Sequence, residues 1–314
     1  MKKRETTSRF EKGFINTIKA DLSQRWMLYL MIAPLIAYYI IFHYMPMYGA
    51  QIAFRDFLPS RGVLGSSWVG LKHFQSFFSG IFVGRLIRNT IVISFYMLVW
   101  GFPIPIIFAL LLNEVHNSRF KRTVQTITYL PHFVSLVVMC GIIVSFTNRD
   151  GLINDLIEMF GGERISMLMF PEYFRPVYVV SGIWQEIGWN SIIYLAAIAG
   201  VNQELYEAAT VDGAGRFRKM LNVTLPGIAP TIIILLILRF GQLMNVGFEK
   251  VLLLQNASNL ETADVISTYV YRRGLENADY SFSAAVGLFN SVINFFMIVC
   301  ANKFSSKVSE TSLW

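Results

Sequence analysis

The chain has 314 residues, of which 54% are apolar and only 15% are charged, and its mean hydropathy is +0.49. A soluble globular domain carries about 25% charged residues, so this composition excludes an ordinary soluble protein and indicates a membrane protein. The formal net charge of +7 does not indicate a nucleic-acid-binding protein, because the basic residues lie at the ends of apolar runs, where they orient membrane segments.

Six apolar runs are long enough to cross a bilayer as helices, which takes about 20 residues each. We expect an N-terminal tail over 1–25, spans near 26–46, 89–112, 124–147, 177–201, 227–247 and 284–302, and a tail over 303–314. The first run continues past the length of a signal-peptide apolar region, and no small-residue cleavage site follows, so we interpret it as a retained span. The sequence therefore predicts an all-α, multi-pass membrane protein whose residues 26–302 form one six-helix domain.

Basic residues set the orientation of these spans. If both termini lie inside, the inner segments carry Lys and Arg at about twice the density of the outer segments. Both termini are therefore predicted to be cytoplasmic. The outer segments 43–88, 148–176 and 248–283 are long, and the one long inner segment is the loop over 202–226.

The sequence offers little for catalysis. It contains no G-x-x-x-x-G-K-[ST] phosphate-binding loop, and its four histidines are scattered. Cys140 and Cys300 lie inside apolar runs with no metal-ligand spacing around them. We expect no catalytic residue, no metal and no cofactor bound by this chain, so an enzyme acting alone is not predicted.

The inner loop is expected to form two short helices with a bend. Asn202 is a favourable N-cap and Gly213 a favourable helix end, while Asp212 is placed to cap the second helix. The second helix presents basic residues on one side and apolar residues on the other, and Pro226 suits the first turn of the next span. These features alone leave two interpretations open, an amphipathic helix lying on lipid or an element that docks a protein.

The same loop resembles the signature of binding-protein-dependent ABC importer permeases, in which E-A-A is followed by three residues, G, nine residues and I-x-L-P. This chain has Glu207-Ala208-Ala209, Gly213 and Val223-Thr224-Leu225-Pro226, with Val in place of Ile. The segments Trp68–Phe74, Asn89-Thr90, Leu111–Asn113, Tyr129–Pro131 and Gly151–Asn154 are similar to the maltose-type carbohydrate-uptake branch. The segment 46–56 resembles the subgroup that handles oligosaccharides from complex polysaccharides.

The resemblance implies a type I ABC importer permease fold in the bacterial cytoplasmic membrane, and a carbohydrate as the transported solute. It implies three kinds of protein partner: a second homologous permease, two copies of a cytoplasmic ATPase that binds the ATP and Mg, and an extracellular substrate-binding protein. The inner loop would then be the coupling helix that docks the ATPase, through Glu207, Ala208, Ala209, Asp212, Gly213, Arg216, Phe217, Leu225 and Pro226.

Two polar stripes lie inside the spans, where ionisable residues are costly and often functional. On the fourth span Glu186, Trp189, Asn190 and Tyr194 share one helical face. On the fifth span Arg239, Gln242, Asn245 and Glu249 share another. Aromatic faces beside hydrogen-bonding groups suit a sugar, so the candidate substrate path is Glu186, Trp189, Asn190, Tyr194, Arg239, Gln242 and Asn245.

These polar residues also have a purely structural interpretation, as contacts between helices. Arg239 is expected either to pair with Glu186 or to meet an acidic sugar. On the sixth span Gly287, Asn290, Ser291 and Asn294 share a face suited to packing against the partner permease. The competing functions are an ion-coupled secondary transporter, a membrane-embedded enzyme or channel, a structural scaffold, and an ABC permease for a non-sugar solute.

Overall fold

The computed structural model describes residues 24–308 of the chain. The chain divides between Val69 and Gly70 into two compact units. Most of the predicted tails, residues 1–23 and 309–314, lie outside the described residues. Residues 303–308, which were predicted to begin the C-terminal tail, instead continue the helix of the sixth span, so that span is longer than its apolar run.

The first unit consists of one long helical run followed by a small hairpin. The run comprises α2 (Trp26–Tyr39), η1 (Ile40–Tyr44), α3 (Met45–Met47) and η2 (Tyr48–Phe54). β1 (Arg55–Asp56) pairs antiparallel with β2 (Ser67–Trp68) around α4 (Gly62–Gly65), with Arg55 opposite Trp68. No residue of α2 is buried, as expected of a single helix whose apolar side chains face lipid or another protein.

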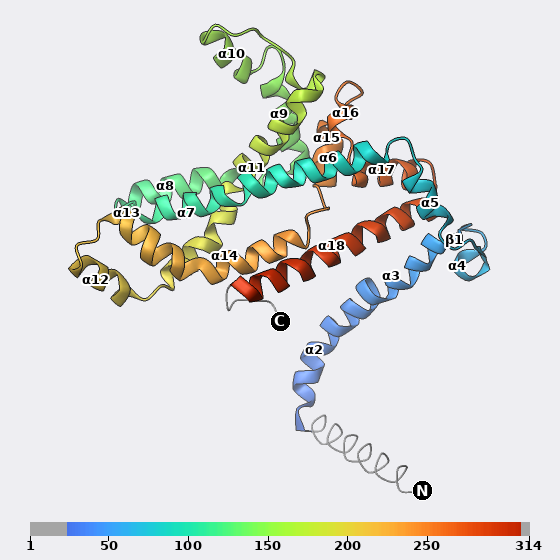
Figure 1. Ribbon diagram of the computed structural model, residues 1–314, viewed down its shortest axis with the longest axis horizontal. Helices are drawn as coiled ribbons and strands as arrows, with labels where there is room; N and C mark the ends of the chain where they lie inside the picture. Colours follow the sequence, from blue (N-terminus) through green and yellow to red (C-terminus); the bar gives the residue numbers. More distant parts are fainter. Residues whose placement is uncertain (1–23, 309–314) are drawn as a thin grey trace. The chain divides into compact units, whose positions relative to one another are not determined.

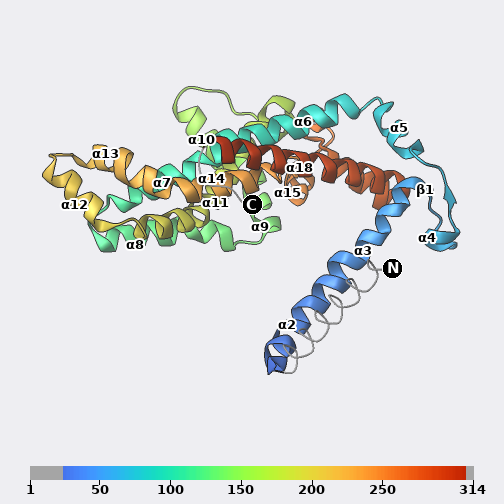
Figure 2. The ribbon, with the colours of Figure 1, turned by 60° about the horizontal axis from the view of Figure 1, so that its bottom comes forward.

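The second unit is a helical bundle. Its elements are α5 (Lys72–Phe78), α6 (Val83–Tyr96), η3 (Met97–Gly101), α7 (Pro103–Asn113), α8 (Ser118–Tyr129), η4 (Leu130–Phe133), α9 (Leu136–Thr147), α10 (Leu152–Met159), η5 (Met167–Met169), α11 (Pro171–Ala199), α12 (Gln203–Val211), α13 (Arg216–Lys219), η6 (Met220–Thr224), α14 (Leu225–Phe240), α15 (Phe248–Leu254), α16 (Leu260–Ala263), α17 (Ile266–Tyr271), η7 (Arg272–Glu276) and α18 (Tyr280–Val308). Within this unit α12 and α13 lie at one end and α5 at the other, and α18 runs beside α14 (Figures 1 and 2).

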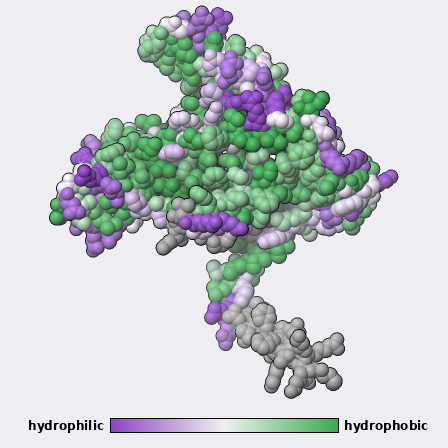
Figure 3. Space-filling view, viewed as in Figure 1, coloured by the Kyte–Doolittle hydropathy of each residue, from purple (hydrophilic) through white to green (hydrophobic). Residues whose placement is uncertain are grey.

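Within residues 24–308, five helical stretches are long and apolar enough to cross a membrane: Trp26–Phe54, Val83–Asn113, Leu136–Met159, Arg216–Phe240 and Tyr280–Lys307. The predicted fourth span is not among them. It lies in α11, a 29-residue helix that is long enough, but Gln185, Glu186 and Asn190 lower its apolar content. In the view of Figure 3 apolar residues cover the middle of the bundle, and hydrophilic residues gather over α12 and α13.

The third predicted span, 124–147, is wrong as a single helix. α8 runs into η4 at Leu130–Phe133, the backbone becomes extended at Val134, and a new helix, α9, starts after Ser135. The Ser135 hydroxyl oxygen accepts a hydrogen bond from the Val138 amide at 3.4 Å, which marks a helix N-terminus. The break follows Pro131, whose ring favours an extended or tight-turn backbone around it.

The fifth predicted span, 227–247, is shifted toward the N-terminus. The helical stretch begins at Arg216 and ends at Phe240, and residues 241–247 form turns and irregular backbone before α15. Gly241 and Gly247 flank this non-helical segment. The stripe of Gln242, Asn245 and Glu249 is therefore not a helical face, although these residues follow Arg239 closely.

α11 is the centre of the packing. Its buried residues belong to two hydrophobic clusters, one with α9 and α15 and one with α7 and α14. At Gly188 it comes so close to α8 that an added Cβ would meet the Thr128 carbonyl oxygen at 2.3 Å. This backbone-to-backbone approach, which only glycine allows, fixes the part of α11 that carries Glu186, Trp189 and Asn190.

Candidate functional site

Two adjoining cavities lie between α6, α11 and the end of α14. Their volumes are about 700 and about 520 Å³. They share a wall made of Met97, Gly182, Glu186, Arg239 and Gln242. We call the larger one, which reaches the 241–250 segment, the outer lobe, and the smaller one, which reaches Tyr194, the inner lobe.

All seven residues of the predicted substrate path line these lobes. Glu186, Arg239 and Gln242 belong to both lobes. Trp189, Asn190 and Tyr194 line the inner lobe, and Asn245 lines the outer lobe. The two polar stripes predicted from the sequence therefore face one common space, which the fold assembles from α11 and from the chain after α14.

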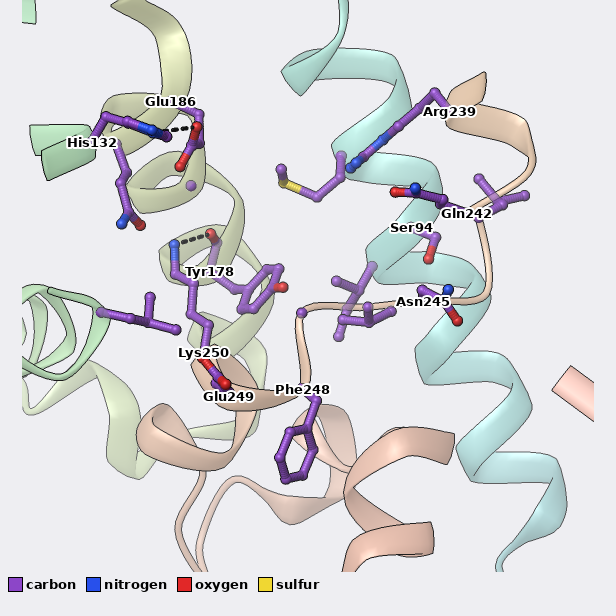
Figure 4. Close-up of a pocket in the computed structure, with 18 of the residues that line it drawn as sticks. Ser94, His132, Tyr178, Glu186, Arg239, Gln242, Asn245, Phe248, Glu249 and Lys250 are labelled. Atoms are coloured by element: carbon purple, nitrogen blue, oxygen red, sulfur yellow. Dashed lines mark hydrogen bonds and ion pairs between the residues drawn. The ribbon is translucent and has the colours of Figure 1, made fainter. Parts of the chain in front are cut away.

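Glu186 contacts His132 and not Arg239, so the first of the two alternatives expected for Arg239 is not observed. Oε2 of Glu186 lies 3.0 Å from Nδ1 of His132, and Arg239 makes no ion pair within residues 24–308 (Figure 4). The His132 ring stacks on Trp189 with 4.3 Å between ring centroids and an angle of 4°. His132 lies in η4, just before the break, and contacts α11. It was not among the site residues predicted from the sequence because its partner is 54 positions away.

The irregular segment after α14 is held by the sixth span. The side-chain amides of Asn290 and Asn294 donate hydrogen bonds to Oδ1 of Asn245, at 3.0 and 3.2 Å. Oδ1 of Asn294 accepts a hydrogen bond from the Met244 amide at 3.0 Å. These bonds position the wall of the outer lobe within this chain, and the expectation that the same face packs against a partner permease stays a prediction.

Lys250 is a cavity residue that the sequence analysis missed. It lines the outer lobe, and only 7% of it is exposed. Its Nζ donates to the Tyr178 carbonyl oxygen at 3.4 Å and lies 5.1 Å from the centre of the Tyr178 ring (Figure 4). The available sequence signal was weak, a single lysine between Glu249 and four apolar residues in a segment expected to be an outer loop.

The inner loop contains the predicted first helix and bend, but the predicted second helix, α13, is the start of the helical stretch that continues to Phe240. The Asn202 side chain caps α12 by accepting a hydrogen bond from the Glu204 amide at 3.0 Å. At the other end Gly213 has φ +75°, and the Ala214 amide donates to the Ala209 carbonyl at 2.8 Å, which closes α12 in a Schellman motif. The prediction for Asp212 is wrong, because it is the C-cap of α12, while α13 begins only after Gly215.

The surface of this loop combines apolar and polar exposure. Val211 is 89% exposed and Phe217 is 69% exposed. Glu207 and Ala208 are exposed, and Glu207 lines a cavity of about 440 Å³ together with His116, Arg216 and Lys219. The Tyr206 hydroxyl lies 2.9 Å from the Thr224 hydroxyl, which ties α12 to the helix that follows. An ordered loop that exposes apolar side chains in this way suits contact with another protein.

No metal centre is found in the part of the chain that the structure describes, since no three His, Cys, Asp or Glu side chains gather there. The described site is thus a polar and aromatic cavity inside a membrane bundle, with an ordered loop at one end of that bundle.

Comparison with known proteins identifies the family. Residues 101–310 match the family described as "Binding-protein-dependent transport system inner membrane component". The chain is 46% identical to the polygalacturonan/rhamnogalacturonan transport system permease protein YteP of Bacillus subtilis (strain 168), over 97% of this chain and 95% of the relative. It is also 46% identical to protein LplB of the same organism, over 96% and 94%.

A solved structure is also similar. It is a crystal structure of a bacterial ABC transporter involved in the import of the acidic polysaccharide alginate, with a TM-score of 0.86, 42% identity, and coverage of 93% of this chain and 99% of the other. The same transporter in complex with an alginate pentasaccharide-bound periplasmic protein matches with a TM-score of 0.87. The chain belongs to the family of binding-protein-dependent transport system inner membrane components, and is a multi-pass permease subunit of an ABC importer rather than an enzyme.

Proposed function

We propose that this permease imports an oligosaccharide released from a complex polysaccharide, and that the sugar passes through the outer and inner lobes. The observation that carries the proposal is the composition of the shared cavity. Trp189 and Tyr194 offer ring surfaces beside the hydrogen-bonding groups of Asn190, Gln242 and Arg239. Sugars need both, because their C–H faces stack on rings while their hydroxyls need donors and acceptors. One similar protein is a polygalacturonan/rhamnogalacturonan transport system permease, and another belongs to an ABC transporter involved in the import of alginate.

The membrane arrangement that we propose has six spans with both termini in the cytoplasm. α11 supplies the span that composition alone leaves out, and its polar residues face the cavity rather than lipid, which makes their presence in a span tolerable. The distribution of Lys and Arg supports the orientation. It puts α12 and α13 in the cytoplasm and the segment around α10 outside.

We propose that the inner loop docks a cytoplasmic ATPase. Glu207 and Ala208 would enter a groove of the ATPase, while Gly213 holds the bend and Phe217 presents an apolar contact. ATP and Mg would bind to the ATPase, and this chain would bind no cofactor. A second permease and an extracellular binding protein would complete the importer, and closure of the ATPase pair would turn the cavity from inward-open to outward-open.

Uptake measurements test the transport proposal. We expect deletion of this chain to abolish uptake of labelled oligosaccharides from one polysaccharide class, and Trp189→Ala to reduce that uptake several-fold. Uptake of sugars from pectin, alginate and arabinan that does not depend on this chain would contradict the proposal.

The docking proposal has its own matched pair of variants. Glu207→Arg is expected to lower substrate-stimulated ATPase activity strongly while the subunit still inserts. Glu204→Arg, a change of the same charge on the same helix but in its first turn, is expected to act much less. Equal effects of the two changes would remove Glu207 as the anchor.

A further inference from the structure

The buried ammonium group of Lys250 makes no ion pair with any of residues 24–308. Its neighbours are the Tyr178 carbonyl at 3.4 Å and the Tyr178 ring, and no carboxylate of residues 24–308 lies within ion-pair distance. Gly182 makes room for it, since an added Cβ there would lie 3.4 Å from Nζ. An ammonium group removed from water is costly unless an anion or several acceptors compensate it. The chain supplies Lys250 with one long hydrogen bond.

A second cation faces the same outer lobe. Arg239 extends into it from the end of α14, on the opposite wall from Lys250 (Figure 4). In the described part of the chain its guanidinium makes no ion pair. Glu186, the carboxylate of the shared wall, is bonded to His132 at 3.0 Å instead. Two cations from different elements therefore border one cavity, and neither makes an ion pair with Glu186 or Glu249, the two carboxylates that line it.

The start of α9 borders this lobe as well. Val134 and Leu136 line it, on either side of the N-cap Ser135. The first amide groups of a helix have no acceptor within the helix, and its N-terminus carries a partial positive charge. The break in the third span thus brings a further electropositive group to a cavity that already contains Lys250 and Arg239.

Two carboxylates also line the lobe, Glu186, which is bonded to His132, and Glu249. Glu249 lines the lobe and is exposed. In Figure 4 it lies near the base of the Lys250 side chain, whose ammonium group points away toward Tyr178. The lobe is therefore polarised, with Glu249 at the side of α15 and the cationic groups around its interior.

We propose that Lys250, Arg239 and the N-terminal amides of α9 bind a carboxylate of the transported oligosaccharide, so that this permease selects sugars that contain a uronic acid. The inference rests on the proposed function, because it places the substrate in the outer lobe. A carboxylate there gives Lys250 its counter-ion, and charge-assisted hydrogen bonds of this kind are stronger than neutral ones. A neutral sugar of the same size would leave both cations unpaired.

Binding to the purified, membrane-reconstituted transporter tests this inference, with trigalacturonate and its fully methyl-esterified form as probes. The two probes have the same rings and differ in charge. We expect the wild-type transporter to bind trigalacturonate about tenfold or more tightly than its methyl ester. Added salt is expected to weaken the binding of trigalacturonate and to leave the binding of the ester unchanged. Lys250→Met is expected to remove this difference, and Lys250→Arg to retain most of it.

Lys303→Met is the matched control, since Lys303 lies on α18 outside both lobes and is exposed. It is expected to leave both affinities unchanged. The carboxylate site is overturned if the wild-type transporter binds acid and ester equally, or if Lys250→Met weakens the binding of both equally. Either result leaves the proposal that the cavity binds an oligosaccharide standing. Failure of the wild-type transporter to bind either probe overturns the selectivity for uronic acids, and if neutral oligosaccharides also fail to bind, the proposed function falls with it.

Discussion

His132 and Glu186 are joined by a hydrogen bond beside the break in the third span, with 3.0 Å between Nδ1 and Oε2, and the imidazole stacks on Trp189. Both side chains are partly exposed, so the pair is worth about 0.5–1 kcal/mol rather than the larger value of a buried pair. A double-mutant cycle with His132→Ala and Glu186→Ala, read from thermal unfolding of the purified transporter, is expected to give this coupling energy. The cycle of His132→Ala with Glu249→Ala is the control, because Glu249 lines the same lobe without bonding to His132; equal coupling in both cycles would contradict the assignment.

Gly213 adopts a backbone conformation that other residues reach only at a cost. At φ +75°, with no atom within 4 Å of an added Cβ, the cost of Gly213→Ala is purely conformational, about 1 kcal/mol. We expect the variant to insert normally but to lose several-fold in coupled transport, measured as solute moved per ATP hydrolysed. Gly215→Ala has the same open surroundings at an ordinary negative φ and should behave like wild type. If Gly213→Ala and Gly215→Ala move the same amount of solute per ATP hydrolysed, the bend at Gly213 does not determine how ATP hydrolysis is coupled to transport.

Gly188 allows α11 to touch the backbone of α8. Gly188→Ala is expected to push the two helices apart and to lower the free energy of unfolding by about 1–3 kcal/mol, the usual cost of overpacking, because an added Cβ would meet the Thr128 carbonyl. Thermal denaturation in detergent measures this. Gly141→Ala on α9, where an added Cβ meets nothing within 4 Å, should leave the melting temperature nearly unchanged. If Gly188→Ala also leaves the melting temperature unchanged, the close contact between α11 and α8 at Gly188 is refuted.

Asp264 is the buried carboxylate that joins the elements around α17. It is 1% exposed, and both its oxygens lie within 2.7 Å of Arg272, with Arg85 at 3.4 Å. Because the two arginines are about one-third exposed, we expect Asp264→Ala to cost about 1–3 kcal/mol of stability rather than the full cost of stranding a buried charge. Urea or thermal unfolding measures the loss. Asp155→Ala breaks an exposed ion pair with Arg164 and should change the free energy of unfolding little. An equal loss of stability in Asp155→Ala and Asp264→Ala would contradict the stabilising role of the buried Asp264 carboxylate.

The features that the sequence predicted well are those set by neighbours along the chain. The cap at Asn202 and the helix end at Gly213 depend on residues two to five positions away, and both are observed. Asp212 was misplaced because it is equally suited to either of two adjacent helix ends, and only the closed Schellman motif decides between them. The seven path residues line the lobes because polar residues in a span avoid lipid, whatever helix carries them.

The features that the sequence did not predict depend on contacts between distant segments. Glu186 selects His132 over Arg239 because the chain breaks after Pro131, and this break is a tertiary feature. Lys250 reaches Tyr178 across 72 positions. α14 ends at Phe240, and the irregular segment that follows it is held by hydrogen bonds to Asn290 and Asn294, which lie about 50 positions further along the chain.

The helical stretch from Arg216 to Phe240 has a mechanical consequence. It spans 25 residues from the inner loop to the cavity wall, where it carries Arg239, and 25 residues are about 37 Å long at the rise of an α-helix. The π-helical segment η6 (Met220–Thr224) and Pro230 lie within it, but the stretch is helical throughout. If the inner loop docks an ATPase as proposed, a movement of the end at the inner loop would therefore be transmitted to Arg239 and the solute along a single helical stretch.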